Sequence, residues 1–319
     1  MQFYMAGKLA ASGRVAGLYH RPAYEPLLDE LRASGERICA YPFNRPAFAA
    51  FASIPLSWFS YRTALLVAAV GNLLLLILLV WKLPAWFGLP AWSRPCLAVF
   101  PPFLLAVGMG QDILLVTVLV AGAVRLASTG REAPAGVLLA FCAVKPHLIW
   151  ALPVALLVAG KRRMLWSFLA TTLVLTGISL AAVGSRGVEQ WFALLRAPST
   201  DYQPGSMVNV RALALHWGAA AGIAAAAIAA LGLGLVLRRG SFQQKLAASL
   251  LASLLLSPHT YSYDLSLLAI AAPLAGLPGL LLPWAYAFSR PDSIPWILAS
   301  LASLAWIAAR AAAQHERAA

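Results

Sequence analysis

Long apolar runs separated by short polar segments make up most of the chain after residue 60. A helix needs about 20 apolar residues to cross a bilayer, and several runs approach that length. The shorter runs predict broken helices, which are tolerated at membrane depth where they pack in protein or line a wet cavity. The pattern therefore predicts an all-α, polytopic transmembrane helical bundle. The expected apolar segments lie near residues 62–82, 96–109, 113–127, 134–145, 147–160, 164–184, 212–237, 244–257, 263–275, 278–289 and 294–310.

The first sixty residues have a different pattern. They carry many charges and two short amphipathic stretches, near Ala6 to Ala16 and Tyr24 to Ala33. Three prolines in YPFNRPAFAAFASIPL then interrupt any long helix. We predict an extracytoplasmic amphipathic segment over residues 1–60 and a multi-span membrane domain over residues 61–319.

The composition excludes an ordinary soluble domain. Only 11% of the residues are charged and 61% are hydrophobic, whereas a soluble domain carries about 25% charged residues. The net charge of +13 would suggest nucleic acid in a soluble protein. Here Lys and Arg lie at helix ends, where they fix topology and meet anionic lipid. The bilayer is the expected partner, and no nucleic acid is expected.

No cofactor or metal is expected. The cysteines Cys39, Cys96 and Cys142 are scattered and form neither a disulfide framework nor a metal pattern. Five dispersed histidines make no ligand set. The nucleotide-binding glycine motifs and the common hydrolase motifs are absent as well, which argues against ATP-driven transport by this chain alone.

The loop charges predict which side of the membrane each segment faces. Cytoplasmic loops carry an excess of Lys and Arg, and the clearest basic loops are residues 161–163 and 238–239. With both inside and the chain alternating, only Glu132 and Glu316 of the eleven acidic residues fall inside. Acidic residues do not enter the rule, so their gathering indicates that the outer face carries the chemistry. This topology also leaves the N-terminus outside without a preceding helix. We therefore expect that Met1 is not the natural start or that an upstream helix was lost.

Two short polar segments interrupt the apolar runs on the outer side. In GMGQD, Asp112 opens the next helix and serves as an N-cap, as a site carboxylate with Gln111 beside it, or as both. In KPH, Lys145 and His147 flank a helix-breaking proline. An ionisable residue at membrane depth is a functional candidate. Lys145 either faces a phosphate or snorkels from a helix end.

The densest polar cluster between apolar segments is SPHTYSYDL at residues 257–265. It places His259, Tyr261, Tyr263 and Asp264 within six residues. A carboxylate and an imidazole near an interface suit proton transfer or phosphate orientation. The alternative is an interfacial turn with a tyrosine belt, in which Asp264 is an N-cap.

Two further segments supply polar residues on the same side. YPFNRP holds Tyr41, Asn44 and Arg45 just before the first span. Arginine suits bidentate phosphate binding, although an interfacial arginine fits the same position. The outer loop over residues 185–211 ends in Arg211 and contains the amphipathic stretch EQWFALL, which fits a lid or a helix at the lipid surface.

The order of these motifs resembles glycosyltransferase family 87, the polyprenol-phosphate-mannose-dependent α-mannosyltransferases of the GT-C superfamily. The resemblance spans nearly the whole chain and rests on FYMAGKLAASG and LY at 3–19, YPFNRPAF and IPL at 41–56, GMGQ at 108–111, the AG-initiated helix ending in KP at 135–146, the basic KRR, PGSMVNVR at 204–211 and SPHTYSYDL at 257–265.

The resemblance implies a GT-C-like bundle in the plasma membrane, the inner membrane of a bacterium, with an extracytoplasmic active face. It implies inverting, metal-independent transfer of a hexose, mannose first of all, from a polyprenyl-phosphate donor to a glycan or glycolipid acceptor. A carboxylate takes the proton of the acceptor hydroxyl while the lipid phosphate leaves. In the family, the catalytic Asp lies just after the first transmembrane helix, shortly before the pair that appears here as Phe3 and Tyr4. The chain has Met-Gln at that point, so as written it is expected to be inactive or severely impaired.

The resulting site prediction divides the outer polar residues by role. Donor or phosphate contact falls to Lys145, Arg45, His259 and Arg211. Acceptor orientation falls to Asp112 and Asp264, and the site lining to Tyr41, Asn44, Gln111, His147, Tyr261 and Tyr263. Two alternatives remain: a secondary transporter or lipid flippase, and a non-catalytic scaffold of envelope-glycan synthesis. The absence of internal repeats, and polar residues near one face instead of the midplane, count against a transporter.

Overall fold

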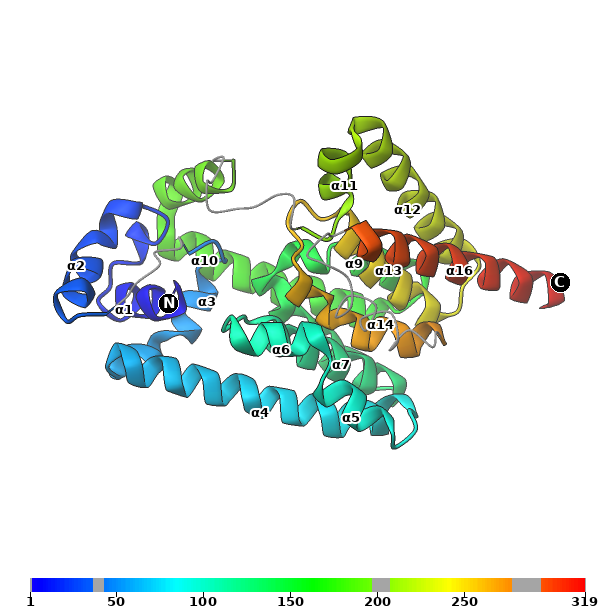
Figure 1. The fold of residues 1–319 in the computed structure, drawn as a ribbon, viewed down its shortest axis with the longest axis horizontal. Coiled ribbons are helices and arrows are strands. Elements are labelled where there is room, and N and C mark those ends of the chain that lie inside the picture. Colours follow the sequence, from blue (N-terminus) through cyan, green and yellow to red (C-terminus); the bar gives the residue numbers. More distant parts are fainter. Residues whose placement is uncertain (1, 37–42, 197–206, 277–293, 319) are drawn as a thin grey trace. The chain divides into compact units, whose positions relative to one another are not determined.

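The computed structural model describes residues 2–36, 43–196, 207–276 and 294–318, and the regular elements within these ranges are all helical (Figure 1). The all-α prediction is therefore confirmed. The chain forms two compact units. The first unit comprises residues 1–71 and 170–202, and the second comprises residues 72–169 and 203–319. Two long helices, α4 (Tyr61–Phe87) and α10 (Arg162–Arg196), contribute to both units. The boundary predicted at residue 60 stays a prediction.

Four of the described helices are long and apolar enough to cross a membrane. They are α4, α10, α12 (Ala219–Arg239) and the stretch Ile297–His315 of α16 (Ile294–Ala318). Large apolar side chains such as Leu66, Leu173 and Leu231 stand exposed on them, as expected for surfaces that face lipid. The prediction of a multi-span membrane protein is confirmed.

Shorter apolar helices also appear where the short runs predicted them, over 93–108, 113–128, 132–144, 242–256 and 262–275. The expected segment at 212–237 is instead two helices, α11 (Val210–Trp217) and α12, separated at Gly218. The expected segment at 278–289 lies outside the described residues.

The first unit is built on the short helix α1 (Gln2–Ala11), which packs against α3 (Phe48–Ala52) and the 3-10 turn η3 (Ile54–Trp58). The helix ends earlier than its amphipathic stretch predicted, because Gly13 adopts a left-handed conformation that terminates it. The second amphipathic stretch forms α2 (Glu25–Ala33), which buries Leu28 and Leu31.

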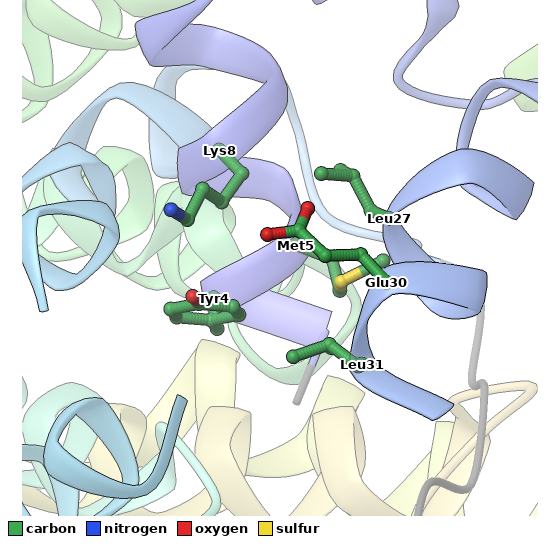
Figure 2. A pocket seen from close by; sticks show the side chains of 6 residues that line it. All are labelled: Tyr4, Met5, Lys8, Leu27, Glu30 and Leu31. Atoms are coloured by element: carbon green, nitrogen blue, oxygen red, sulfur yellow. The ribbon is translucent and has the colours of Figure 1, made fainter. Parts of the chain in front are cut away.

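Figure 2 shows a small hollow of the first unit, where Lys8 and Tyr4 of α1 face Glu30 and Leu27 of α2. Its volume of about 10 Å³ holds no more than about one water molecule. The hollow is therefore too small for a sugar.

The part of α10 from residue 170 onward belongs to the first unit and contains a break at Gly184 (φ 66°). This is the residue at which the predicted span 164–184 ends. Beyond the break, Trp191 donates from Nε1 to the carbonyl of Asn44 at 3.4 Å and stacks on Tyr19. The amphipathic stretch EQWFALL lies in this part of α10 and is helical.

The second unit is organised around α13 (Phe242–Leu256), which is buried along most of its length. Figure 1 shows α16 beside it, and α9 (Leu152–Val158), α12 and α14 (Leu268–Ala275) also pack against it. Small polar residues let the backbones approach: Ser253 Oγ accepts a hydrogen bond from the backbone N–H of Ala151 at 3.2 Å. The remaining elements of the unit are α5 (Ser93–Ala98), α6 (Pro101–Gly108), α7 (Ile113–Ser128), α8 (Glu132–Ala140), η4 (Phe141–Val144), η5 (Pro146–Leu148), α9 (Leu152–Val158), η7 (Ser262–Leu267) and α14 (Leu268–Ala275).

The helices of the second unit join polar residues into two separate clusters. At one, Lys161 Nζ lies 2.8 Å from Glu132 Oε1 and connects the start of α8 to the start of α10. The other lies at the opposite ends of α7 and of the α8–η4 segment, where Asp112, Lys145 and Asp264 meet. We call these the Lys161 end and the Lys145 end. Each end gathers residues that the loop charges placed on one side of the membrane.

Candidate active site

Lys145 lies at the centre of a buried ionic cluster. Its Nζ is 2.8 Å from Asp264 Oδ1 and 3.1 Å from Asp112 Oδ1, and the residue is 1% exposed. Residues that precede proline avoid the α region, so Pro146 ends the helical segment here and Lys145 adopts φ −127°. The snorkelling interpretation of Lys145 is therefore wrong, because the ammonium points into the protein.

The two carboxylates come from different local settings. Asp264 is the third residue of η7, and its Oδ2 accepts the backbone N–H of Tyr261 at 3.0 Å. It thus supports the start of η7, but Tyr261 and not Asp264 occupies the N-cap position. Asp112 does occupy the N-cap position of α7, yet its side chain makes no capping hydrogen bond. Capping by the Asp112 side chain is therefore excluded, and its carboxylate bonds to Lys145.

An aromatic ring borders the same ammonium. The Nζ of Lys145 lies 4.9 Å from the centroid of the Tyr263 ring, and Tyr261 stacks on Tyr263 at 5.7 Å. An ammonium has three N–H donors, and the two carboxylates receive its strongest bonds. The cluster holds two carboxylates against one ammonium. A further anion placed on Lys145 would therefore meet two negative groups.

A second group of polar residues joins the start of α11 to the turn after α13. The backbone N–H of Val208 donates to the carbonyl of Thr260 at 2.8 Å. Asn209 Nδ2 donates to the carbonyl of Ser257 at 2.9 Å, while its Oδ1 accepts the N–H of Ala212 at 3.1 Å. The turn is held internally by Ser257 Oγ, which donates to the carbonyl of His259 at 2.9 Å.

Arg211 and His259 come together through this junction. Arg211 is exposed in the first turn of α11, and His259 is half-buried in the turn. Burial lowers the pKa of His259 below its ordinary value, and the nearby Arg211 guanidinium lowers it further. At neutral pH the imidazole is therefore uncharged, and the cation of the pair is Arg211.

The segment 257–264 connects the two groups, since it holds His259 near one end and Asp264 at the other. Of the remaining predicted residues of this unit, Gln111 lies half-buried in the turn before Asp112. His147 is half-buried in η5, two residues after Lys145. The structure thus brings Asp112, Lys145, Tyr263 and Asp264 together, and it brings Arg211 near enough to His259 to act on the pKa of the imidazole.

Arg45 and Asn44 belong to the first unit. Arg45 is 7% exposed, and its Nη1 donates to Asn44 Oδ1 at 2.6 Å. The hydroxyl of Tyr19 donates to the carbonyl of Arg45 at 2.8 Å, which fixes the backbone of this segment. Tyr41 lies outside the described residues.

The sequence reasoning did not select Asn209 as a site residue. A signal was present, because Asn directly before the apolar run VRALAL is a common helix start. Its bond to Ser257 joins positions 48 residues apart, and no local pattern predicts such a contact. Within the described ranges, no group of three or more His, Cys, Asp and Glu side chains has the geometry to hold a metal ion.

Comparison with known proteins gives one family match. The model of glycosyltransferase family 87 matches residues 43–258 of the 319. No curated protein and no solved structure matches the chain. The matched range contains Asp112, Lys145 and Arg211 and ends directly before His259. Asp264 lies beyond it and reaches the other residues through its ion pair with Lys145.

Proposed function

Since the chain belongs to glycosyltransferase family 87, and is therefore a membrane glycosyltransferase, we propose that it transfers a hexose from a polyprenyl-phosphate donor. Mannose is the first sugar to test, and the proposed acceptor is a glycan or glycolipid. The proposed transfer inverts the anomeric centre and needs no metal. It takes place on the extracytoplasmic face of the bacterial inner membrane.

One observation carries the proposal: the eight-residue segment 257–264 ends in the buried carboxylate cluster at Asp264, and near its other end it bonds to the segment that carries the exposed Arg211. Displacement of a lipid phosphate needs positive charge against the leaving oxygens. It also needs a carboxylate that orients the acceptor hydroxyl and takes its proton. Arg211 with His259 answers the first need, and Asp112 with Asp264 answers the second.

Arg211 and His259 are the proposed contacts of the donor phosphate. The guanidinium presents paired N–H donors that match phosphate oxygens, and Arg211 is exposed at a helix start, where anions are favoured. The neutral imidazole of His259 adds one N–H donor. An arriving phosphate would favour the protonated imidazole, so the charge on His259 would follow donor binding.

Asp112 and Asp264 are the proposed acceptor-orienting carboxylates, and Lys145 holds both in place through its two ion pairs. Contact between Lys145 and the donor phosphate stays a prediction, and so do the roles of Arg45 and Asn44. The lining roles of Tyr41, Gln111, His147, Tyr261 and Tyr263 also stay predictions.

The contacts support the assignment of loops to two sides of the membrane. Glu132 and Lys161 were both placed inside and lie 2.8 Å apart. Asp112, Lys145 and Asp264 were all placed outside and also meet. The proposed direction, with the Lys145 end outside, rests on the basic loops near the Lys161 end.

The test is transfer by the full chain in proteoliposomes. Farnesyl phosphate mannose labelled in the sugar is supplied as donor, with extracted membrane glycolipid as acceptor, and donor binding is titrated separately. Since the chain has Met-Gln at the position of the family's catalytic Asp, we expect only slow formation of a labelled glycolipid with inverted linkage, and donor binding is the main readout. Arg211→Met should weaken donor binding about tenfold or more. Arg239→Met, which removes an exposed arginine from the end of α12, should leave binding unchanged.

Three outcomes would contradict the proposal. Movement of the lipid-linked sugar across the bilayer without product would favour a transporter or flippase. Failure to bind the donor would favour a scaffold. Equal effects of the two arginine substitutions would remove Arg211 from the phosphate site.

A further inference from the structure

Asn209 is fully buried, and two of its side-chain hydrogen bonds differ in kind. Its Oδ1 accepts the N–H of Ala212 at 3.1 Å and caps α11. Its Nδ2 donates to the carbonyl of Ser257 at 2.9 Å and reaches the end of α13. The first bond stabilises α11 itself. The second fixes where α11 begins relative to the turn at 257–260.

The anchoring bond lies at the base of the two proposed phosphate contacts. Asn209 stands two positions before Arg211, and Ser257 stands two positions before His259. A second hydrogen bond, from the backbone N–H of Val208 to the carbonyl of Thr260, joins the same two segments of the chain. Burial of Asn209, Ser257 and Thr260 shields these bonds from water, which would otherwise compete for them.

Position matters here because Arg211 is exposed. An exposed arginine side chain has several rotatable bonds, and the position of its backbone sets the region that the guanidinium can reach. Two groups that bind one phosphate must be held in the right mutual geometry, and a displacement of 1 Å can cost about a hundredfold in rate. An anchor under one of them is what such a site requires.

We infer that Asn209 is a positioning residue, whose amide bond to the Ser257 carbonyl holds Arg211 beside His259 so that both groups meet the same donor phosphate. The inference rests on the proposed function, since it needs Arg211 to contact the donor. It assigns no substrate contact to Asn209, which is enclosed by protein.

The chain offers variants that separate anchoring from capping. Asn209→Ser retains an N-cap acceptor but removes the donor to Ser257, whereas Asn209→Ala removes both. Ser241→Ala is the matched control. Ser241 caps α13, and its Oγ accepts the N–H of Gln244 at 3.3 Å within a capping box. That cap lies at the start of α13, whereas Asn209 contacts the residue that follows its end.

The experiment titrates farnesyl phosphate mannose against the full chain in proteoliposomes and records the melting temperature of each variant. We expect Asn209→Ser to weaken donor binding about tenfold, with a small change in melting temperature. Asn209→Ala should weaken binding by a similar factor and lower the melting temperature further. Ser241→Ala should lower the melting temperature and leave donor affinity unchanged.

A double substitution identifies the route of the effect. If Asn209 acts through Arg211, then Asn209→Ser in an Arg211→Met background should change donor affinity by less than about twofold. A full tenfold loss in that background would overturn the inference, because Asn209 would then act independently of Arg211.

The remaining outcomes separate this inference from the proposed function. Normal affinity in Asn209→Ser, together with weak binding in Arg211→Met, would overturn the positioning role alone. Normal affinity in Arg211→Met would overturn the phosphate role of Arg211, and the positioning role with it.

Discussion

Two lysines of the second unit make nearly the same contacts in different surroundings. Lys145 and Lys161 each place Nζ 2.8 Å from a carboxylate oxygen. Each also lies over an aromatic ring, Tyr263 at 4.9 Å and Phe242 at 5.2 Å. The side chains differ in exposure, at 2% for Lys145 and 30% for Lys161. The distances alone would make the two pairs equivalent, and burial makes them different.

The physical difference is the cost of removing charge from water. The Lys161 pair keeps part of its hydration, so its attraction is screened and a lost partner is replaced by solvent. The Lys145 cluster has lost its hydration and depends on its own members for compensation. Lys145 also serves two carboxylates, where Lys161 serves one. The comparison predicts that equal substitutions at the two ends have unequal effects.

The largest effect is expected from replacing each lysine by methionine. Lys145→Met leaves two buried carboxylates beside each other without a cation, and should lower the free energy of unfolding by about 3–5 kcal/mol. Lys161→Met should lower it by about 0–1 kcal/mol. Unfolding of the purified protein by SDS titration in mixed micelles measures both. Equal losses would show that burial does not distinguish the two ends.

The next effect compares the two carboxylates of the Lys145 cluster. Asp264→Ala removes the bond to Lys145 and the bond to the Tyr261 N–H, and should cost about 2–3 kcal/mol. Asp112→Ala should cost about 1 kcal/mol, because Lys145 keeps its closer partner and the pair that remains is neutral. The same unfolding measurement ranks them. A larger loss in Asp112→Ala would reverse our ranking of the two carboxylates.

A smaller effect is expected from the aromatic rings. Tyr263→Leu should lower stability by about 1 kcal/mol more than Phe242→Leu, since a cation over a ring gains more where water is excluded. Tyr263→Phe retains the ring and serves as the control, with a change within about 0.5 kcal/mol. If Tyr263→Phe costs as much as Tyr263→Leu, the tyrosine hydroxyl and not the ring is responsible.

The smallest effect concerns acidification near the Lys145 end. Burial holds the pKa of His259 below its ordinary value of 6.5, and Arg211 contributes in the same direction. Above pH 6.5 the imidazole is neutral in both the folded and the unfolded chain. As the pH falls below 6.5, the imidazole is protonated in the unfolded chain before it is protonated in the folded chain. The free energy of unfolding therefore decreases as the pH falls from 6.5 to the lower pKa of His259 in the folded chain.

His259→Gln should therefore show a smaller fall in melting temperature between pH 7.5 and pH 5.5 than the unaltered chain. His216→Gln, which removes a histidine near the end of α11, is the control and should retain the full fall. An identical fall in all three proteins would refute the role of His259 in this pH dependence.

The helices follow largely from the sequence, because the signals that form them are local. Apolar length predicted the long spans, and Gly184 ends the span at the predicted residue. The breaks within the short segments were visible as prolines, as at Pro146. The division of residues 212–237 at Gly218 was missed, since a glycine inside an alanine-rich run does not by itself end a helix.

Only some of the candidate site residues, and none of their contacts, could be predicted from the sequence. Lys145 was selected because an ionisable residue at membrane depth is costly, which is true whatever its partner. Its partners were not predictable, because Asp264 is 119 positions away and was equally consistent with an N-cap. Asn209 was read as part of a loop, because its bond to Ser257 depends on how two distant segments pack.

The sequence by itself determined that the chain is helical, that it is built for a membrane and that its acidic residues gather on one predicted side. These properties depend on the order of apolar and polar residues along short stretches. Tertiary structure decided that Lys145 pairs with two carboxylates instead of snorkelling, and that Asn209 joins α11 to the turn after α13. Hydration and hydrogen-bond partners depend on which distant segments exclude water together, so packing alone could decide them.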